Sequence, residues 1–132
     1  MSRLLRAWAP VVAVCAVLFW LSSQSQLPSP HIPNIDKVEH ATAYGILAWL
    51  AMRAFGASSL DAAWGVVLAS LYGVSDEIHQ AFVPGRSSDV FDWMADTAGA
   101  LVALYLFRRW RAHRAAGKSN TPAPLGAPET AQ

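Results

Sequence analysis

Four long apolar stretches, separated by short polar segments, limit what this chain can fold into. Each stretch is apolar on all sides rather than on one face, which is typical of a helix surrounded by lipid. Hydrophobic residues make up 54% of the chain and charged residues 14%, a composition too apolar for an ordinary soluble domain of 132 residues. We therefore predict an all-α integral membrane bundle of four transmembrane helices; a soluble helical bundle is the alternative.

The predicted transmembrane helices cover about residues 4–21, 37–55, 60–75 and 89–107. Prolines, serines and glutamines before the second helix predict an external loop, and glycine and serine residues after it predict a short turn. The predicted membrane domain covers residues 1–110. Residues 111–132, basic at first and then rich in proline and alanine, are predicted to form a disordered cytoplasmic tail.

The first apolar stretch has a second interpretation, because a secretory signal peptide also combines a basic start with an apolar run. Residues 23–25, Ser-Gln-Ser, offer a small-x-small pattern for cleavage. Bulky residues at positions 19–21 and the length of the run favour a retained helix instead. Cys15, the only cysteine, lies in this stretch, so neither an intrachain disulfide nor a thiolate metal cluster is expected.

The charged residues predict the orientation of the bundle. One side of the four-helix layout collects seven arginines: Arg3, Arg6, Arg53, Arg108, Arg109, Arg111 and Arg114. The opposite side carries mainly acidic residues, and its only Lys or Arg residues are Lys37 and Arg86. Because cytoplasmic flanks are enriched in Lys and Arg, both termini are predicted to be cytoplasmic in a multi-pass protein of the cell membrane. Eight of the nine acids lie between Asp36 and Asp96, and no nucleic-acid partner is expected.

Three polar motifs, distant in the sequence, meet at the extracytoplasmic surface of this layout. They lie at the start of the second helix, the end of the third and the start of the fourth, and each places its polar side chains on one helix face. If the third helix continues beyond Val74, this face is predicted to carry Asp76, His79 and Gln80. The predicted ligand-binding residues are Asp36, Lys37, His40, Tyr44, Asp76, Glu77, Gln80, Arg86, Asp89, Asp92 and Asp96.

Asp96 is the most informative of these residues. It lies about two turns inside the fourth helix, where an embedded carboxylate costs about 2.5 to 3.5 kcal/mol and needs a partner or a wet cavity. The available cations are Lys37, His40 and Arg86. Helix capping is the alternative explanation for polar residues in a first turn, but it does not explain His40, Tyr44 or Asp96, which lie deeper.

The sequence contains residue types that bind metals, but they do not occur at a recognisable metal-binding spacing. His40, His79 and the carboxylates of the fourth helix include groups that bind metals. However, the sequence contains no HExxH or comparable pattern, so no metal ligands and no cofactor are predicted. Solvation at the membrane surface is an equally good account of His79.

The same residues carry a resemblance to a known family. They read Asp36-Lys37-Val38-Glu39-His40, then SDEIHQAFVPGR over residues 75–86, followed by Asp89, Asp92, Asp96 and Gly99. This order resembles the VanZ-like family of small membrane proteins, in which Asp-Lys-x-x-His and Asp-Glu-x-x-Gln-x-Phe-x-Pro-x-Arg patterns recur. The resemblance covers roughly residues 36–106. It implies a theme of the cell envelope and antibiotic resistance, because the family is named for a protein linked to resistance to the glycopeptide teicoplanin.

Two hypotheses concern a ligand at the extracytoplasmic site. The first is a cell-envelope protein acting on or with an amphiphile, either a lipid-linked precursor or a lipoglycopeptide. Lys37 and Arg86 would bind its phosphate or carboxylate groups, and Asp76, Glu77 and Asp92 its amines, hydroxyls or a cation. The second is an intramembrane hydrolase or transferase acting on a lipid head group. Its candidate catalytic residues are His40, Asp76, Glu77, His79 and Asp96.

For the second hypothesis, His40 or His79 would be the base and Asp76 or Asp96 its orienting partner, but no nucleophile elbow or phosphate loop supports it. A third hypothesis is a small proton- or ion-coupled transporter, because embedded acids and histidines form relays in membranes. The expected partner in all three cases is the lipid bilayer, and no oligomeric state is predicted.

Overall fold

The computed structural model describes residues 2–25, 33–57 and 61–119. It contains four helices, which are α1 (Arg3–Ser22), α2 (Ile35–Ala57), α3 (Trp64–Gln80) and α4 (Val90–Ser119). No strand occurs among the described residues, so the all-α prediction with four helices is confirmed. Most of the predicted external loop, and the predicted tail from residue 120 onward, lie outside the described residues.

The third helix is shifted along the chain relative to the prediction of residues 60–75. It begins at Trp64, after a turn in which the Asp61 carboxylate accepts a hydrogen bond from the Ala63 backbone at 2.7 Å. It ends at Gln80, so the polar residues at positions 76–80 are helical rather than part of a loop. Their side chains reach partners on neighbouring segments, which allows a polar sequence to remain in the helix.

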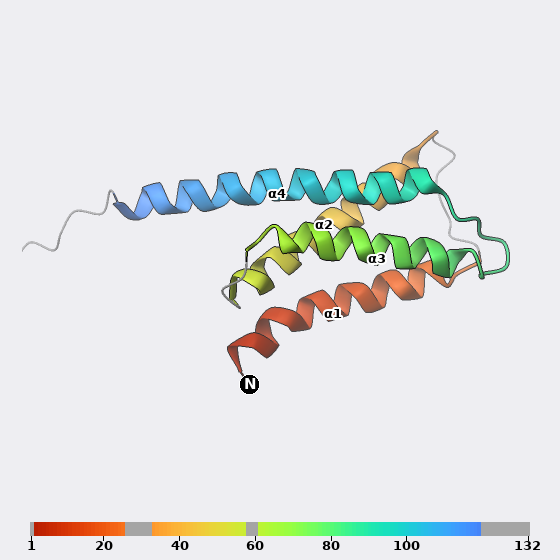
Figure 1. Cartoon of the computed structure of the whole chain (residues 1–132), viewed down its shortest axis with the longest axis horizontal. Helices are drawn as coiled ribbons and strands as arrows, with labels where there is room; N and C mark the ends of the chain where they lie inside the picture. The colour runs from red at the N-terminus through yellow and green to blue at the C-terminus, as the bar shows by residue number, and fades with distance from the viewer. Residues whose placement is uncertain (1, 26–32, 58–60, 120–132) are drawn as a thin grey trace, which may run out of the picture.

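The fourth helix continues to Ser119, twelve residues beyond the predicted end at residue 107. Residues 111–119, which we expected in the tail, are therefore helical. Arginine and alanine in this segment favour a helix. Trp110 packs against Trp49 of α2, with ring centroids 5.7 Å apart, and the Arg114 guanidinium lies 4.7 Å from the Trp110 ring. These contacts anchor the part of α4 that projects beyond the other helices (Figure 1).

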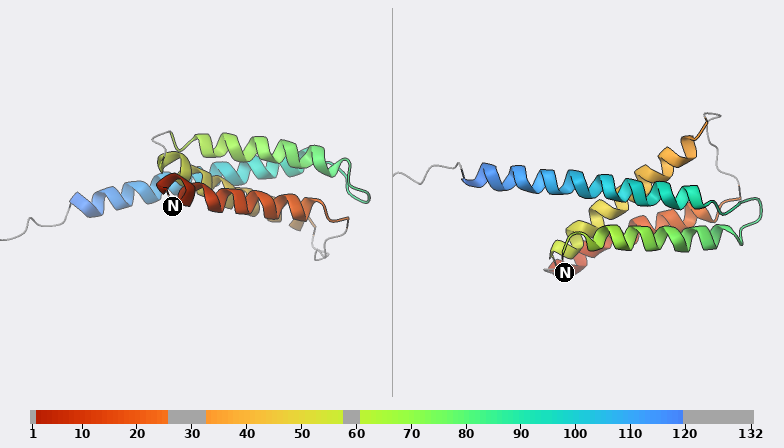
Figure 2. Two further views of the ribbon diagram at one scale, coloured as in Figure 1. Left: turned by 90° about the horizontal axis from the view of Figure 1, so that it is seen from below. Right: turned by 45° about the horizontal axis from the view of Figure 1, so that its top comes forward.

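The helices run alternately up and down, so their ends gather in two groups (Figure 1). The starts of α1 and α3 and the end of α2 lie at one end of the bundle, where α4 leaves it. The end of α3 and the starts of α2 and α4 lie at the other. Helix α2 contacts all three other helices and crosses them obliquely (Figure 2). This arrangement brings the three polar motifs to a common end, as the four-helix layout predicted.

The interior is built from small residues, and many large apolar side chains face outward. Fully buried alanines include Ala48, Ala51, Ala54, Ala69 and Ala100. Large exposed side chains include Trp20, Leu71, Phe91 and Tyr105. Small residues at helix contacts and large apolar residues outside are the pattern of helices packed in lipid. Residues Arg3–Ser22 and Val90–Gly117 are long and apolar enough to cross a membrane.

Among the described glycines, Gly99 lies closest to the backbone of another helix. A Cβ atom at this position would lie 1.9 Å from the backbone oxygen of Ala41, so α4 touches the backbone of α2 there. The contact between α2 and α4 is also the most extensive contact between two helices. These two helices carry the residues that dominate the polar site.

Candidate functional site

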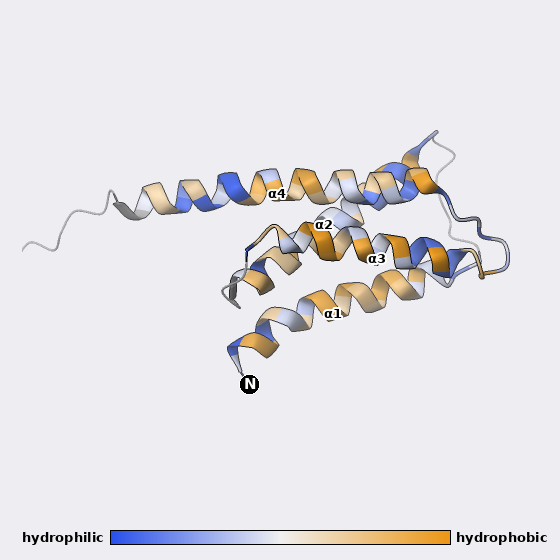
Figure 3. Cartoon of the chain, in the orientation of Figure 1, coloured by the Kyte–Doolittle hydropathy of each residue, from blue (hydrophilic) through white to orange (hydrophobic). Residues whose placement is uncertain are grey.

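In the part of the chain that the structure describes, buried polar side chains lie at one end of the bundle, where hydrophilic parts of α2 and α3 meet the start of α4 (Figure 3). Among the described residues they are Ser22, Asp76, Glu77, Gln80, Asp92 and Asp96. Five of these six were predicted as site residues. The rest of the buried core is apolar, so this end is the candidate functional site.

Lys37 organises the outer part of the site. Its Nζ atom lies 2.6 Å from Asp89 Oδ2, 2.6 Å from Asp92 Oδ1 and 3.0 Å from Asp36 Oδ2. We call these four residues the lysine cluster. Because the carboxylates come from α2, from the start of α4 and from the residue before it, the ammonium group ties the two helices together at their outer ends.

His40 and Asp96 form the inner part of the site. His40 Nδ1 lies 2.9 Å from Asp96 Oδ1, and the Asp96 side chain is fully buried. His40 is therefore the partner that the embedded carboxylate was predicted to need. The ring of Tyr44, itself 1% exposed, lies parallel to the His40 ring with centroids 6.2 Å apart. The polar stripe of α2 thus continues into the bundle as predicted.

Gly73 and Ser88 are two positions of the site that the sequence did not single out. A Cβ atom on Gly73 would lie 2.7 Å from Asp96 Oδ2, so the missing side chain makes room for the carboxylate. Glu77 Oε2 accepts hydrogen bonds from Ser88 Oγ at 3.1 Å and from the Asp89 backbone N–H at 2.7 Å. The signal for Gly73 was its spacing of three residues before Asp76, which puts both on one face of α3.

Three buried oxygens of the site have no hydrogen-bond partner in the part of the chain that the structure describes: Tyr44 OH, Glu77 Oε1 and Asp96 Oδ2. His40, Glu77 and Asp96 each offer one potential ligand atom, and these three atoms lie within 4.8 Å of one another. They come from α2, α3 and α4 in turn. These are the described residues that could hold a metal ion, and their spacing in the chain matches no familiar ligand motif.

A polar chain of hydrogen bonds borders the site. Arg86 donates to Gln80 Oε1 at 2.7 Å, and Gln80 donates to Asp76 Oδ2 at 3.1 Å. These three residues, with His40 and Tyr44, line a pocket of about 130 Å³ that also contacts the end of α1. Arg86 therefore contacts the amide of Gln80 and forms no ion pair with a carboxylate among the described residues.

His79 does not join the other predicted site residues. Its Nε2 atom lies 3.0 Å from Ser23 Oγ, and its ring packs on Phe19 with centroids 4.6 Å apart. Successive helical residues differ by about 100°, so His79 turns toward α1 while Gln80 turns inward. His40 is therefore the histidine that contacts the acids, and His79 is a contact between α3 and the segment at the end of α1.

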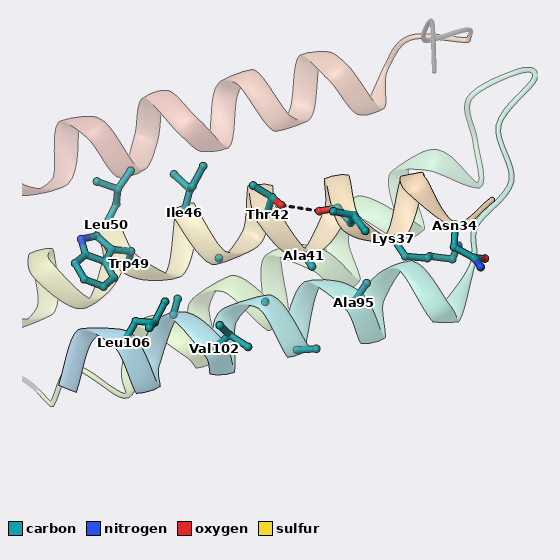
Figure 4. A pocket seen from close by; sticks show the side chains of 15 residues that line it. Asn34, Lys37, Ala41, Thr42, Ile46, Trp49, Leu50, Ala95, Val102 and Leu106 are labelled. Carbon is teal, nitrogen blue, oxygen red and sulfur yellow. Dashed lines mark hydrogen bonds between the residues drawn. The ribbon is translucent and has the colours of Figure 1, made fainter. Parts of the chain in front are cut away.

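A second, larger cavity lies between α2 and α4 and opens on the outside of the bundle (Figure 4). Its volume is about 780 Å³. Lys37 and Asn34 lie at one end, and Trp49, Leu50 and Leu106 lie toward the other (Figure 4). Between them the walls are mostly small or aliphatic. We call this cavity the α2–α4 groove.

Comparison with known protein families matches residues 6–111 to the family described as VanZ/LLP1. The chain belongs to the VanZ/LLP1 family. The predicted resemblance is confirmed, and the match extends beyond residues 36–106 to include most of α1. Comparisons with curated proteins and with solved structures gave no match. Family membership and the two helices able to span a membrane indicate a membrane protein.

In this VanZ/LLP1 protein, the two sequence motifs meet around the acids of α4. The Asp-Lys-x-x-His motif supplies Lys37 to the lysine cluster and His40 to the inner pair. The Asp-Glu-x-x-Gln motif supplies Glu77, which binds the residues before α4, and the Asp76–Gln80 hydrogen bond. Each motif therefore contributes to the same site.

The lysine cluster predicts a pH effect that depends on Lys37. The hydrogen bond from Lys37 holds the pKa of Asp89 below its ordinary value, so Asp89 is protonated less readily in the folded protein than in the unfolded chain. The resulting stabilisation is present above the unfolded pKa of about 4 and is lost as pH falls through the lower folded value. Lys37→Met should raise the Asp89 pKa, as measured by carboxyl carbon NMR titration; an unchanged titration would contradict this pairing.

Proposed function

We propose that this VanZ/LLP1 protein spans the cell membrane four times and binds an amphiphile at its extracytoplasmic surface. The head group would contact the lysine cluster, and the apolar chain would lie in the α2–α4 groove. One observation carries the proposal: Lys37 belongs both to the lysine cluster and to the wall of the groove. Lipid-linked envelope precursors and lipoglycopeptides are two ligand classes with this combination of groups.

The distribution of charge supports this orientation. Seven arginines lie near the start of α1, near the end of α2 and in the last part of α4, which are the helix ends away from the site: Arg3, Arg6, Arg53, Arg108, Arg109, Arg111 and Arg114. Cytoplasmic flanks are enriched in such residues. With both termini cytoplasmic, the end that carries the lysine cluster faces outward, where envelope precursors and antibiotics are found.

The shape of the groove suits an apolar chain. Its wall contains the small residues Ala41, Gly45, Ala98 and Gly99 beside the close contact between α2 and α4, and Ile46 and Val102 flank it. The groove between α2 and α4 is open along its length rather than enclosed. In a bilayer such an opening faces lipid, so a chain could enter from the membrane without crossing water.

The contacts within the site favour a head group that carries amines or hydroxyls. Lys37 is already paired with three carboxylates, and Arg86 donates to Gln80. A phosphate would have to compete with these carboxylates for Lys37. An ammonium group could instead share the exposed edge of the cluster, where Asp36 and Asp89 are the most accessible acids. Binding of a phosphate or carboxylate group by Lys37 and Arg86 is therefore less favoured than binding of an amine or hydroxyl group by the acids.

The groove can be tested by filling it. Ala98 lies on the exposed wall of the groove, so Ala98→Trp should occupy the space without entering the core. We expect binding of teicoplanin, or of a prenyl-diphosphate-linked precursor, to weaken at least tenfold, equivalent to about 1.4 kcal/mol. Calorimetry on detergent-purified protein would measure it. Leu101→Trp is the control, because Leu101 is 53% exposed on α4 and lies outside the groove. Equal binding by the two variants, or no binding by folded wild type, would refute the proposal.

The His40–Asp96 pair supports an intramembrane hydrolase or transferase as the second candidate. Its 2.9 Å contact would orient the imidazole as a general base, with Asp96 as the orienting group. Purified protein incubated with lipid-linked substrates should then form product, and His40→Ala should abolish it. The matched variant His79→Ala should remain active, because His79 lies apart from the acids. Absence of turnover by wild type with any divalent ion added would remove this candidate.

A further inference from the structure

We propose that His40, Glu77 and Asp96 form a binding site for one divalent metal ion. The sequence predicted no metal ligands, because these residues are 37 and 19 positions apart in the chain and form no short motif. The fold brings one ligand atom from each of them within 4.8 Å of the others. The proposal does not depend on an amphiphilic ligand and is tested with metal alone.

The distances are close to those of a bound ion. Ligand atoms about 2.1 Å from one zinc ion lie about 3.4 Å apart in a tetrahedron. The ligand atoms of this site span at most 4.8 Å, and His40 Nδ1 already lies 2.9 Å from Asp96 Oδ1. Small side-chain rotations on three helices would therefore complete the coordination.

Among residues 2–25, 33–57 and 61–119, each of the two acids has one buried oxygen without a hydrogen-bond partner. Glu77 uses Oε2 for its bonds to Ser88 and Asp89, while its Oε1 is buried without a partner. Asp96 uses Oδ1 for His40, while its Oδ2 is buried without a partner and points toward Gly73 of α3, the helix that carries Glu77. Burying an unpaired carboxylate oxygen is unfavourable unless a cation or a donor compensates it.

The lysine and the arginine of the site do not supply this compensation. Lys37 contacts the three acids of the lysine cluster, and Arg86 donates to Gln80. Neither has an ion pair with Glu77 or Asp96 among the described residues. Glu77 and Asp96 are 6% and 0% exposed, so solvent does not screen them either. A divalent ion would balance both carboxylates at once.

The chemistry of the three ligands indicates which ion is favoured. Imidazole nitrogen and carboxylate oxygen together suit Zn²⁺ and Mn²⁺, and Zn²⁺ generally binds such ligands more tightly. Mg²⁺ prefers oxygen ligands and retained waters, so it should bind weakly. His40 also lines the pocket of about 130 Å³, which has room for water beside this ligand.

Zinc titration of the purified full-length protein tests the site. After removal of metal with EDTA, calorimetry should detect one Zn²⁺ per chain, and Glu77→Gln and His40→Ala should each weaken binding at least tenfold. Two matched controls should change the affinity less than threefold. Asp89→Asn removes a carboxylate of the lysine cluster, and His113→Ala removes an exposed histidine near the end of α4.

X-ray absorption on zinc-loaded wild type provides a readout that does not need the variants to fold. It should show one imidazole and carboxylate oxygens around the ion. The proposal is overturned if folded wild type binds no Zn²⁺ or Mn²⁺, if the spectrum lacks imidazole, or if folded Glu77→Gln binds like wild type. None of these outcomes bears on the amphiphile, whose binding is measured separately with the groove variant.

Discussion

Gly99→Ala should destabilise the protein by about 3 kcal/mol, the upper part of the range for overpacking a tightly packed core. The added Cβ atom would lie 1.9 Å from the Ala41 carbonyl oxygen and 2.6 Å from its carbonyl carbon. Both atoms belong to backbone, so α2 and α4 must separate along their most extensive contact. Unfolding by sodium dodecyl sulfate, followed by circular dichroism in mixed micelles, would measure the loss.

Gly117→Ala is the matched control, because it makes the same change on the same helix. Nothing lies within 4 Å of a Cβ atom placed there, and alanine favours a helix over glycine by up to about 1 kcal/mol. This variant should be as stable as wild type or slightly more stable. If Gly99→Ala also kept wild-type stability, the close backbone contact between α2 and α4 would be wrong.

Asp96→Leu should have the second large effect, a loss of about 3 kcal/mol, measured in EDTA so that metal makes no contribution. The substitution removes the fully buried partner of His40 and leaves the imidazole without its 2.9 Å contact. Replacing both residues removes this mismatch. The double variant with His40→Leu should therefore lose less stability than the two single variants combined, by at least about 1 kcal/mol.

The exposed acid Asp36 provides the comparison for Asp96. Its side chain is 53% exposed and contacts only Lys37 among the ion pairs of the described residues, so Asp36→Asn should cost less than about 1 kcal/mol. The same detergent titration measures all four variants. Simple additivity of the His40 and Asp96 substitutions, or a cost for Asp96→Leu no larger than that for Asp36→Asn, would show that the inner pair contributes little to folding.

The positions of all four helices could be predicted, but the bounds of α3 and the end of α4 could not. Apolar runs located α1 and α2 to within two residues at each end. The end of α3 was missed because the polar residues at 76–80 look like a loop until their partners are known. The extension of α4 to Ser119 was missed because it depends on aromatic contacts between Trp110 and α2. Helix ends are decided by neighbours as much as by local composition.

The candidate site was predicted as a group of residues rather than as a set of contacts. The sequence placed His40, Tyr44 and Asp96 inside their helices, and the structure joins His40 to Asp96 as one of the pairings left open. It also predicted His79 beside Asp76 and Gln80, whereas His79 contacts α1. The sequence pattern of a helix defines which face is buried only to within about 100°, the rotation between successive residues. The packing of a neighbouring helix decides which of two adjacent residues faces inward.

By itself, the sequence determined that this chain is helical, that its polar motifs meet at one end, and that it resembles the VanZ/LLP1 family. Those properties follow from apolar length, charge and short motifs, all of which are local. Only the tertiary structure decided that Glu77 joins His40 and Asp96, that Lys37 borders a groove, and that His79 does not join the acids. These features depend on how each helix is rotated about its axis and how closely Gly99 lets α2 and α4 approach, because contacts between distant residues arise only when the helices pack.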